Sequence, residues 1–336
     1  MLCFVLDYQT VLIMESLSWQ KKHCYFCCSS QVKRHGKTNQ NKQRYRCNCC
    51  FKTFIWKRPD AKRFNEQRWF RLWIQESYSV RQLCSLSGHS RFKIQQIKNY
   101  WLNRLPDEHI NYKQCKYIIC DGTYFHKDGC FISLMNAKNQ DIISNIYTKK
   151  EGFYNVYPWF IRLKEQGLNP RYIVMDGERS VMKTIAMTWP NATIQRCLYH
   201  IQREGMRWLR TYPKTAAGRE LRSLLGTLCC IKSVKERDQF IESYNTWLNK
   251  YMSFVKSLPS SNIAFKDLKR TIVLITNALP DMFHYLKKHV IPATTNVLES
   301  FYSRLKADYR RHRGLSKKNK IHYLKWYCYF KNSNTF

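Results

Sequence analysis

Short apolar runs bounded by turn signals dominate the middle of the chain. Lys116–Phe125, Cys130–Asn136 and Ile142–Thr148 are rich in apolar residues and too short for buried helices, so their pattern predicts strands. Asp128-Gly129 is a strong hairpin signal between the first two runs, and a turn at Asn139-Gln140 separates the second from the third. We therefore expect three consecutive antiparallel strands.

Helical and strand-like stretches alternate after these strands. They are a helix over Phe153–Gln166, a strand over Arg171–Asp176, a helix over Glu178–Thr188, a strand over Ala192–Tyr199 and a helix over His200–Arg210. A crossover through the first of these helices places the fourth strand parallel to its neighbour in the same sheet. Three antiparallel strands followed by helix, strand, helix and strand is the order of an α/β, ribonuclease-H-like mixed sheet.

The region before the sheet, Glu66–Leu105, has apolar residues at helical spacing. Within it, Ser79 is placed to cap one helix, Gly88 to allow a turn and Ser90 to cap the next helix. This pattern resembles a helix-turn-helix. The side chains expected to face a groove or phosphates are Arg91, Lys93, Gln95, Gln96 and Lys98. The alternative is a three-helix spacer with no role in DNA binding.

The region after the sheet changes character again. In Arg219–His289 leucines and aromatic residues repeat every three or four positions, which predicts an all-helical insertion that packs on itself. A further helix follows Pro292, with Thr294 or Thr295 as its cap. The residues expected near one face of this helix are Asn296, Glu299 and Ser303. The pattern assigns no class to the final stretch, Ile321–Phe330.

The chain of 336 residues carries a strong positive charge. Its 58 Lys and Arg outnumber 23 Asp and Glu, for a formal net charge of +35 spread from Lys21 to the C-terminus. That distribution indicates a polyanionic partner, most simply nucleic acid, and the alternative is a solvated basic surface. Met1–Met14 is apolar but too short and too polar for a spanning helix, and no cleavable signal is evident. A cytoplasmic, nucleoid-associated location is expected.

Four of the fifteen cysteines form two C-x-x-C pairs. Cys24 with Cys27 and Cys47 with Cys50 flank a polar, basic loop. Four thiolates on two tight turns suit tetrahedral Zn²⁺, and a segment with so little apolar material gains its fold from the metal. Adjacent buried cysteines are the alternative. The spare thiols, Cys28 and Cys49, leave the register of the zinc ligands open.

Two aspartates are expected at the ends of strand-like apolar runs. Asp121 follows Tyr117–Cys120 and Asp176 follows Tyr172–Met175, and each is succeeded by a glycine. With Glu299 they make an all-oxygen set suited to Mg²⁺, and two such ions roughly 4 Å apart catalyse phosphoryl transfer. The alternative is that the aspartates only cap strand ends or turns. The rivals for the third acid are Glu178, Glu204 and Asp308.

These motifs together resemble the DDE transposases of bacterial insertion sequences, on the branch shared with the eukaryotic Mutator-like elements. The resemblance covers roughly residues 24–315. It rests on Asp121-Gly-Thr, Val174-Met-Asp176-Gly, Cys197-Leu-Tyr-His200, Thr295-Asn-Val-Leu-Glu299 with Lys306 seven residues on, and a ribbon ending in Cys-Asn-Cys-Cys-Phe-Lys-Thr-Phe54. The departures from the family pattern are the apolar N-terminal extension and the extra cysteine in the ribbon.

The resemblance implies a function. Asp121, Asp176 and Glu299 would bind two Mg²⁺ ions, cut the ends of the element by water attack and join the 3′-hydroxyls to target DNA. A homodimer or larger assembly on double-stranded DNA, bound at terminal inverted repeats, is also implied. The family carries the Cys197-x-x-His200 motif near the active site, but two ligands alone make no structural zinc site. His200 is expected to contact DNA or to orient an acid, and the alternative is a buried Cys beside a helix-starting His.

The expected organisation has five parts. They are a zinc ribbon at 19–58, a helix-turn-helix-like unit at 60–106, the first part of the catalytic core at 112–210, an all-helical insertion at 211–291 and the last part of the core, with Glu299, at 292–320. Two other functions remain open at this level. One is a catalytically inactive or domesticated DNA-binding repressor, and the other is a nuclease acting on RNA–DNA hybrids, which the ribbon and the insertion disfavour.

Overall fold

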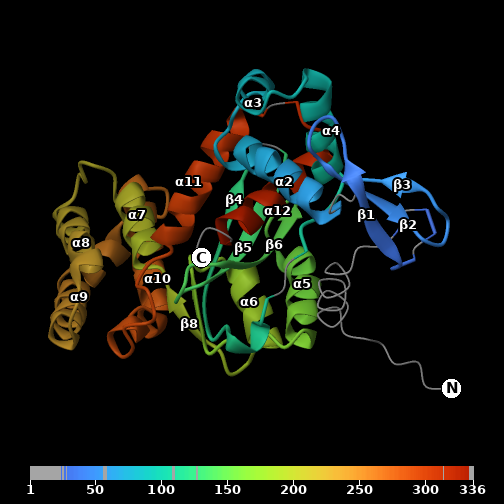
Figure 1. Ribbon diagram of the computed structural model, residues 1–336. Coiled ribbons are helices and arrows are strands. Elements are labelled where there is room, and N and C mark those ends of the chain that lie inside the picture. The colour runs from blue at the N-terminus through green and yellow to red at the C-terminus, as the bar shows by residue number, and fades with distance from the viewer. Residues whose placement is uncertain are drawn as a thin grey trace. The chain divides into compact units, whose positions relative to one another are not determined.

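The computed structural model describes residues 24, 26–27, 29–55, 59–107, 110–125, 128–312 and 314–332. The Met1–Met14 stretch and the spare thiol of Cys28 lie outside these residues. The chain divides into two compact units, one formed by Met1–Trp73 with Ser79–Trp101 and the other by Ile74–Tyr78 with Leu102–Phe336 (Figure 1). Each unit is described by itself below.

The first unit begins with a small antiparallel sheet. Its strands are β1 (Val32–Lys37), β2 (Gln43–Cys47) and β3 (Thr53–Phe54), in the order β1-β2-β3. The buried core of this sheet consists of Cys24, Tyr45, Cys47 and Phe54. So few apolar side chains supply little free energy of folding, which is why a segment of this kind depends on a further crosslink such as a metal ion.

Three helices complete the first unit. They are α2 (Pro59–Gln75), α3 (Val80–Ser87) and α4 (Arg91–Leu102). The predicted caps are confirmed. Ser79 forms a capping box with Gln82 at the start of α3, and Gly88 ends α3 in the left-handed region at φ 66°. The hydroxyl of Ser90 accepts a hydrogen bond from Lys93 N at the start of α4.

The second unit is built on a mixed five-stranded sheet. Its strands are β4 (Tyr117–Tyr124), β5 (Cys130–Asn136), β6 (Ile142–Thr148), β7 (Tyr172–Met175) and β8 (Thr193–Arg196). The order across the sheet is β6-β5-β4-β7-β8, with β4, β5 and β6 antiparallel and β4, β7 and β8 parallel. The predicted hairpins and the parallel crossover are therefore confirmed.

One face of this sheet is covered by α5 (Phe153–Glu165) and α6 (Arg179–Thr188), which lie side by side (Figure 1). Phe160 of α5 and Ile185 of α6 are fully buried and share one core with Cys120 and Ile132 of the sheet. This arrangement explains the continuous apolar character of β4 and β5, because both faces of these strands are buried.

The opposite face is bound by α11 (Asn296–Arg310) and α12 (Lys317–Asn332). The hydroxyl of Tyr302 in α11 donates to the carbonyl oxygen of Asp121 at 2.7 Å. The side chain of Asn332 in α12 bonds both the N–H and the carbonyl oxygen of Ile142, as a neighbouring strand would. The final stretch, which the sequence pattern left unassigned, is thus a helix that caps the sheet edge.

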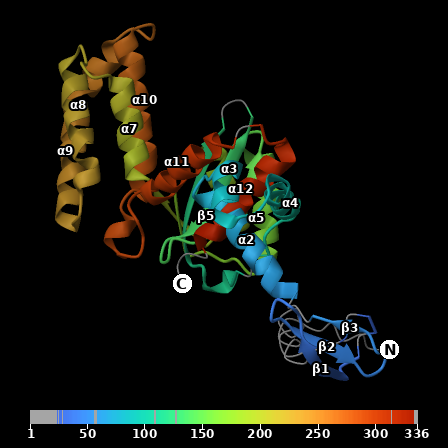
Figure 2. The same ribbon diagram turned by 45° about the horizontal axis from the view of Figure 1, so that its top comes forward.

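The remaining long helices form a bundle with its own core. They are α7 (Leu198–Leu209), α8 (Ala216–Thr227), α9 (Val234–Ser257) and α10 (Ile263–Ala278), which pack side by side (Figure 2). Leu221, Tyr244 and Ile275 are buried in this core. The apolar face of α7, carrying Leu198 and Ile201, also belongs to this bundle.

Short 3-10 helices join these elements at Tyr112–Gln114, Leu228–Cys230, Leu279–Asp281 and His284–Leu286. Within the described part of the chain, every helix is too short or too polar to cross a membrane.

Candidate functional site

Asp121 and Asp176 come together because of the register between two parallel strands. The paired residues of β4 and β7 end at Ile119 and Val174. Asp121 and Asp176 each lie two residues beyond this last pair, along the segments that contain β4 and β7. Asp121 lies inside β4, where it pairs with Ser133 of β5, so the expectation that it stands at a strand end is wrong. The β4–β5 pairing continues to Tyr124 because the hairpin extends β4 beyond its parallel neighbour.

A cluster of possible metal ligands forms at this point. Asp121, Asp176 and His200 each offer one ligand atom, and these atoms lie within 4.8 Å of one another. The Asp121 side chain is 9% exposed and its Oδ1 accepts a hydrogen bond from Gly122 N at 2.9 Å. Burial, followed by the charge of Asp176, raises the pKa of Asp121 well above its usual range. A bound cation would offset both causes.

Glu299 lies beside this cluster and outside it. It stands in the first turn of α11, where its Oε1 is 3.1 Å from Nε2 of His200 and 3.7 Å from a guanidinium nitrogen of Arg203. Its charge adds to the causes that raise the pKa of Asp121, which places it close to the same site. The arrangement therefore links Glu299 to the two aspartates through the His200 imidazole.

The His200 imidazole is mostly buried, at 13% exposure. Burial lowers its pKa more than the charges of Asp176 and Glu299 raise it, so the ring is neutral at physiological pH. Its Nδ1 is buried without a hydrogen-bond partner among the described residues. A neutral imidazole in this position is able to donate one hydrogen bond and to leave the other nitrogen as an acceptor.

Cys197 has a different position from His200. Its side chain is fully buried, and its Sγ accepts hydrogen bonds from the backbone N of Thr295 at 3.3 Å and from the hydroxyl of Thr295 at 3.5 Å. Cys197 thus fastens the start of α7 to the start of α11. Thr295 is the N-cap residue of α11, one of the two predicted, but its side chain makes no capping hydrogen bond because its hydroxyl bonds this sulfur. The structure brings His200, and not Cys197, to the acids.

Glu151 is a fourth acid near the cluster that the sequence pattern did not single out. It precedes α5, and its carboxylate packs directly over Gly122, where an added Cβ would lie 1.8 Å from Oε1. The Cys130 thiol donates to the same oxygen at 3.2 Å. Burial raises the pKa of Glu151, and the charge of Asp176 adds to this effect. The one indication of this close contact in the sequence is that a glycine, Gly122, directly follows Asp121.

The rival acids have structural roles. Glu178 is the N-cap of α6 and accepts from Ser180 N, because β7 ends at Met175 and does not continue to it. Asp308 accepts hydrogen bonds from the hydroxyls of Ser77 and Tyr327. Glu204 pairs with Arg207 on the surface of α7.

The predicted DNA-contacting side chains are scattered. Asn296 is exposed at the first position of α11. Lys306 lies 5.6 Å above the ring of Phe125, and burial lowers its pKa. In the first unit Arg91 is exposed, whereas Lys93 forms an ion pair with Glu66 at 2.7 Å.

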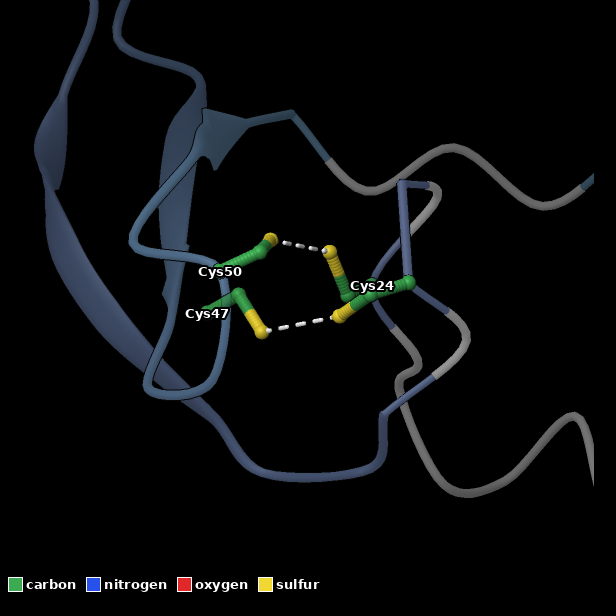
Figure 3. Close-up of side chains that lie close together, drawn as sticks. Cys24, Cys47 and Cys50 are labelled. Atoms are coloured by element: carbon green, nitrogen blue, oxygen red, sulfur yellow. Dashed lines mark hydrogen bonds between the residues drawn. The ribbon is translucent and has the colours of Figure 1, made fainter.

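The four cysteines of the two C-x-x-C pairs converge on one point, and Figure 3 labels Cys24, Cys47 and Cys50 among them. Sγ atoms of Cys24, Cys27, Cys47 and Cys50 lie within 4.8 Å of one another, with Cys24–Cys50 at 3.4 Å and Cys27–Cys47 at 3.5 Å. Hydrogen bonds from the backbone, chiefly from the N–H of Cys50, lower the pKa of Cys47 to about 6. The geometry and the ready thiolate of this four-cysteine group suit tetrahedral Zn²⁺.

Cys49 lies outside this group. Its thiol contacts the Ser29 hydroxyl at 3.1 Å and the Gln31 side chain at 3.7 Å. The described residues therefore favour the register Cys24, Cys27, Cys47 and Cys50.

Comparison with known proteins identifies one family whose sequence model matches the chain. No curated protein matches the chain. A family model described as "Transposase, Mutator family" matches residues 132–314, more than half of the chain and a range that holds Asp176, His200 and Glu299.

Proposed function

Because the chain belongs to the Mutator family of transposases, we propose that it cuts the ends of a mobile DNA element and joins them to target DNA at Asp121, Asp176 and Glu299. The observation that carries this proposal is the convergence of Asp121, Asp176 and His200 within 4.8 Å, with Glu299 in contact with the imidazole. The strand order β6-β5-β4-β7-β8 supports a ribonuclease-H-like core.

The donor set fits a hard divalent cation. Carboxylate oxygens of Asp121 and Asp176 are the ligands that Mg²⁺ prefers, and the adjoining Glu299 supplies a third carboxylate. When bound, two Mg²⁺ ions activate the attacking oxygen and stabilise the leaving oxygen of the phosphodiester. Burial and like charge raise the pKa of Asp121, so a bound cation would stabilise the ionised form of this side chain most strongly.

Three other side chains hold the acids in place. Nε2 of the neutral His200 lies 3.1 Å from the Glu299 carboxylate, and this contact orients the carboxylate toward the aspartates. Tyr302, one turn after Glu299, fastens α11 to β4 at the carbonyl oxygen of Asp121 itself. Cys197 fixes the start of the same helix. Together these contacts keep a glutamate from a distant part of the chain beside the aspartates.

The first unit would recognise the DNA of the element. We propose that the four-cysteine group holds a structural Zn²⁺ and that the ribbon and the α3–α4 pair bind the terminal inverted repeats. The two ends of an element must be brought together for joining, so we propose that the protein works as a homodimer or larger assembly on double-stranded DNA.

The experiment uses the inverted repeats that flank this gene as substrate. The purified chain is expected to cut the repeat ends in Mg²⁺, and Asp121→Ala is expected to abolish cutting while leaving repeat binding intact. Binding to the repeats without any metal-dependent cutting by the wild-type chain would contradict the proposal and favour a DNA-binding repressor. Equal cutting of RNA–DNA hybrids and duplex DNA would favour a hybrid nuclease.

A further inference from the structure

A cavity of about 710 Å³ opens directly beside Asp176. It begins at Gly177 and is enclosed by α6, the end of β8, α7 and α10. Most of the side chains that line it are cationic or apolar, and Asn277 adds one neutral polar group. The cationic ones are Arg179, Arg196, Lys269 and Arg270, and the apolar ones are Met182, Trp208, Val273 and Leu274. Its volume falls in the range of roughly 300–1,000 Å³ that is typical of small-ligand sites.

Arg196 is the most unusual of these residues. It is 7% exposed, and its side chain lies across Gly177, where an added Cβ would sit 2.0 Å from Cζ of the guanidinium. One guanidinium nitrogen donates to the carbonyl oxygen of Asp176 at 3.1 Å, but Nε is buried without a hydrogen-bond partner. Among the described residues no carboxylate forms an ion pair with Arg196. A buried cationic group with an unused donor favours binding of an anion from outside the chain.

The other cations of the cavity are also available. Arg179, Lys269 and Arg270 are exposed, and in the described part of the chain none of them forms an ion pair. Four positive charges surround this cavity, and Asp176 of the acid cluster lies at its edge. The charges attract an anionic ligand, and a ligand long enough to leave the cavity would extend to the proposed metal site at the two aspartates. A nucleic-acid strand has this character, because its phosphates recur along the chain while its sugars and bases are less polar.

We propose that this cavity binds the sugar-phosphate backbone of a single DNA strand, with a phosphate on Arg196 and the next stretch of strand leading to Asp121 and Asp176. The position of the reacting phosphate rests on the proposed function, whereas binding of a strand in the cavity does not. The apolar side, with Trp208 at its wall, contacts sugar and base surfaces, which gives binding that tolerates any base sequence.

The test compares two double variants with the same change of charge. Lys269→Gln with Arg270→Gln removes two charges from the cavity, and Lys235→Gln with Lys256→Gln removes two exposed charges from α9, outside it. Binding of the full chain to a fluorescent 12-nucleotide single strand is measured by anisotropy over a series of salt concentrations, in buffer without Mg²⁺ and without a chelator, so that the proposed zinc stays in place. Without Mg²⁺ the acids do not hold the strand through a metal ion.

The cavity variant is expected to bind about tenfold more weakly at 100 mM salt than the wild type. Its slope of log affinity against log salt is expected to be shallower by about 1.4, since each phosphate contact to a single strand contributes about 0.7. The α9 variant is expected to stay within about twofold of the wild type. Equal loss in the two variants, or none in either, would overturn the inference.

Arg196 is tested separately because removal of a buried side chain can affect folding. Arg196→Gln and the conservative Arg196→Lys are first compared with the wild type by circular dichroism. In folded variants, the rise in Tm that a six-nucleotide single strand produces is expected to be lost in Arg196→Gln and kept in part in Arg196→Lys. A rise equal to that of the wild type in Arg196→Gln would contradict the role of Arg196. If Arg196→Gln does not fold, the strand-binding result for the Lys269→Gln, Arg270→Gln double variant alone decides whether the cavity binds the strand.

The outcomes also separate this inference from the proposed function. Metal-dependent cutting by the wild type together with normal strand binding by the cavity variant overturns the inference and leaves the proposed function standing. Weakened strand binding by the cavity variant of a chain that never cuts DNA supports the inference and overturns the proposed function.

Discussion

Asp121 inside β4 and Asp176 directly after β7 stand level with each other, each two residues beyond the last pair of the parallel β4–β7 ladder, Ile119 and Val174. Backbone hydrogen bonding up to that pair fixes the two acids side by side, although burial and like charge oppose their approach. Desolvation and like-charge repulsion at these two carboxylates therefore reduce the stability of the folded sheet, and a bound cation would offset both effects.

This cost makes the stability of the metal-free protein depend on pH. The folded state raises the pKa of Asp121, so it holds a proton that the unfolded chain has lost above about pH 4. The stabilising effect of that proton is full below pH 4, and stability falls as the pH rises through the raised folded pKa. Asp121→Asn removes this dependence.

At pH 7.5 we expect Asp121→Asn to raise the Tm of the metal-free protein by roughly 2–4 °C, the shift typical of about 1 kcal/mol in a domain of this size. Mg²⁺ is expected to raise the Tm of the wild type and not that of the variant. Differential scanning calorimetry at pH 5 and 7.5 measures both effects, with Asp238→Asn, an exposed change on α9, as the control. A lower Tm for Asp121→Asn would count against the account.

The contact between His200 and Glu299 predicts an effect on metal binding. Replacing His200 by Ala leaves Glu299 without the imidazole that orients it. We expect the Mg²⁺ concentration for half-maximal DNA cutting to rise by about 10- to 100-fold, the usual cost of losing such a partner. His200→Gln, which keeps a donor, is expected to recover part of the effect. An unchanged Mg²⁺ dependence in His200→Ala would show that the contact has no role in metal binding.

Gly122 and Glu151 form a pair that tests local packing beside the site. An added methyl group in Gly122→Ala would lie 1.8 Å from Glu151 Oε1, so the carboxylate must move. We expect the free energy of unfolding to fall by about 1–3 kcal/mol, as for other overpacked positions. In the Glu151→Ala background the same change is expected to cost much less. Urea unfolding of the four proteins measures the coupling, and additive effects would exclude the contact.

The four-cysteine group predicts one zinc ion per chain. Cys47→Ala is expected to lose zinc and the fold of the ribbon, because the small core of this sheet does not suffice without the metal. Cys49→Ala is the matched control and is expected to keep zinc, since its thiol contacts Ser29 and Gln31 instead. Elemental analysis of the purified proteins decides. Loss of zinc from Cys49→Ala would require a different ligand set.

Much of the fold could be predicted because its signals are local. The Asp128-Gly129 turn, the Ser79 and Gly88 caps and the alternation of apolar runs each act within a few residues, and each has its expected effect. The long helical insertion was also visible, because its apolar repeat continues over most of Arg219–His289. The described structure confirms these elements close to their predicted bounds.

The details of the candidate site depended on contacts between distant residues. Thr295 is the N-cap residue of α11, but its hydroxyl bonds Cys197 instead of a backbone N–H of its own helix, and no local pattern reveals this choice. His200 stands between Glu299 and the aspartates only because α7 and α11 meet. In the sequence Arg196 is an ordinary residue of a predicted strand, and nothing local indicates that its guanidinium packs against Gly177.

The most direct test of the central claim is single-turnover cutting of terminal-repeat DNA by Asp176→Asn. Wild-type and Asp238→Asn proteins serve as references, and repeat binding is measured alongside to show that all three proteins bind equally. We expect Asp176→Asn to lower the rate of Mg²⁺-dependent cutting by about 1,000-fold or more, which corresponds to about 4 kcal/mol of transition-state stabilisation, and Asp238→Asn to leave the rate unchanged. Equal rates for Asp176→Asn and the wild type would contradict the central claim.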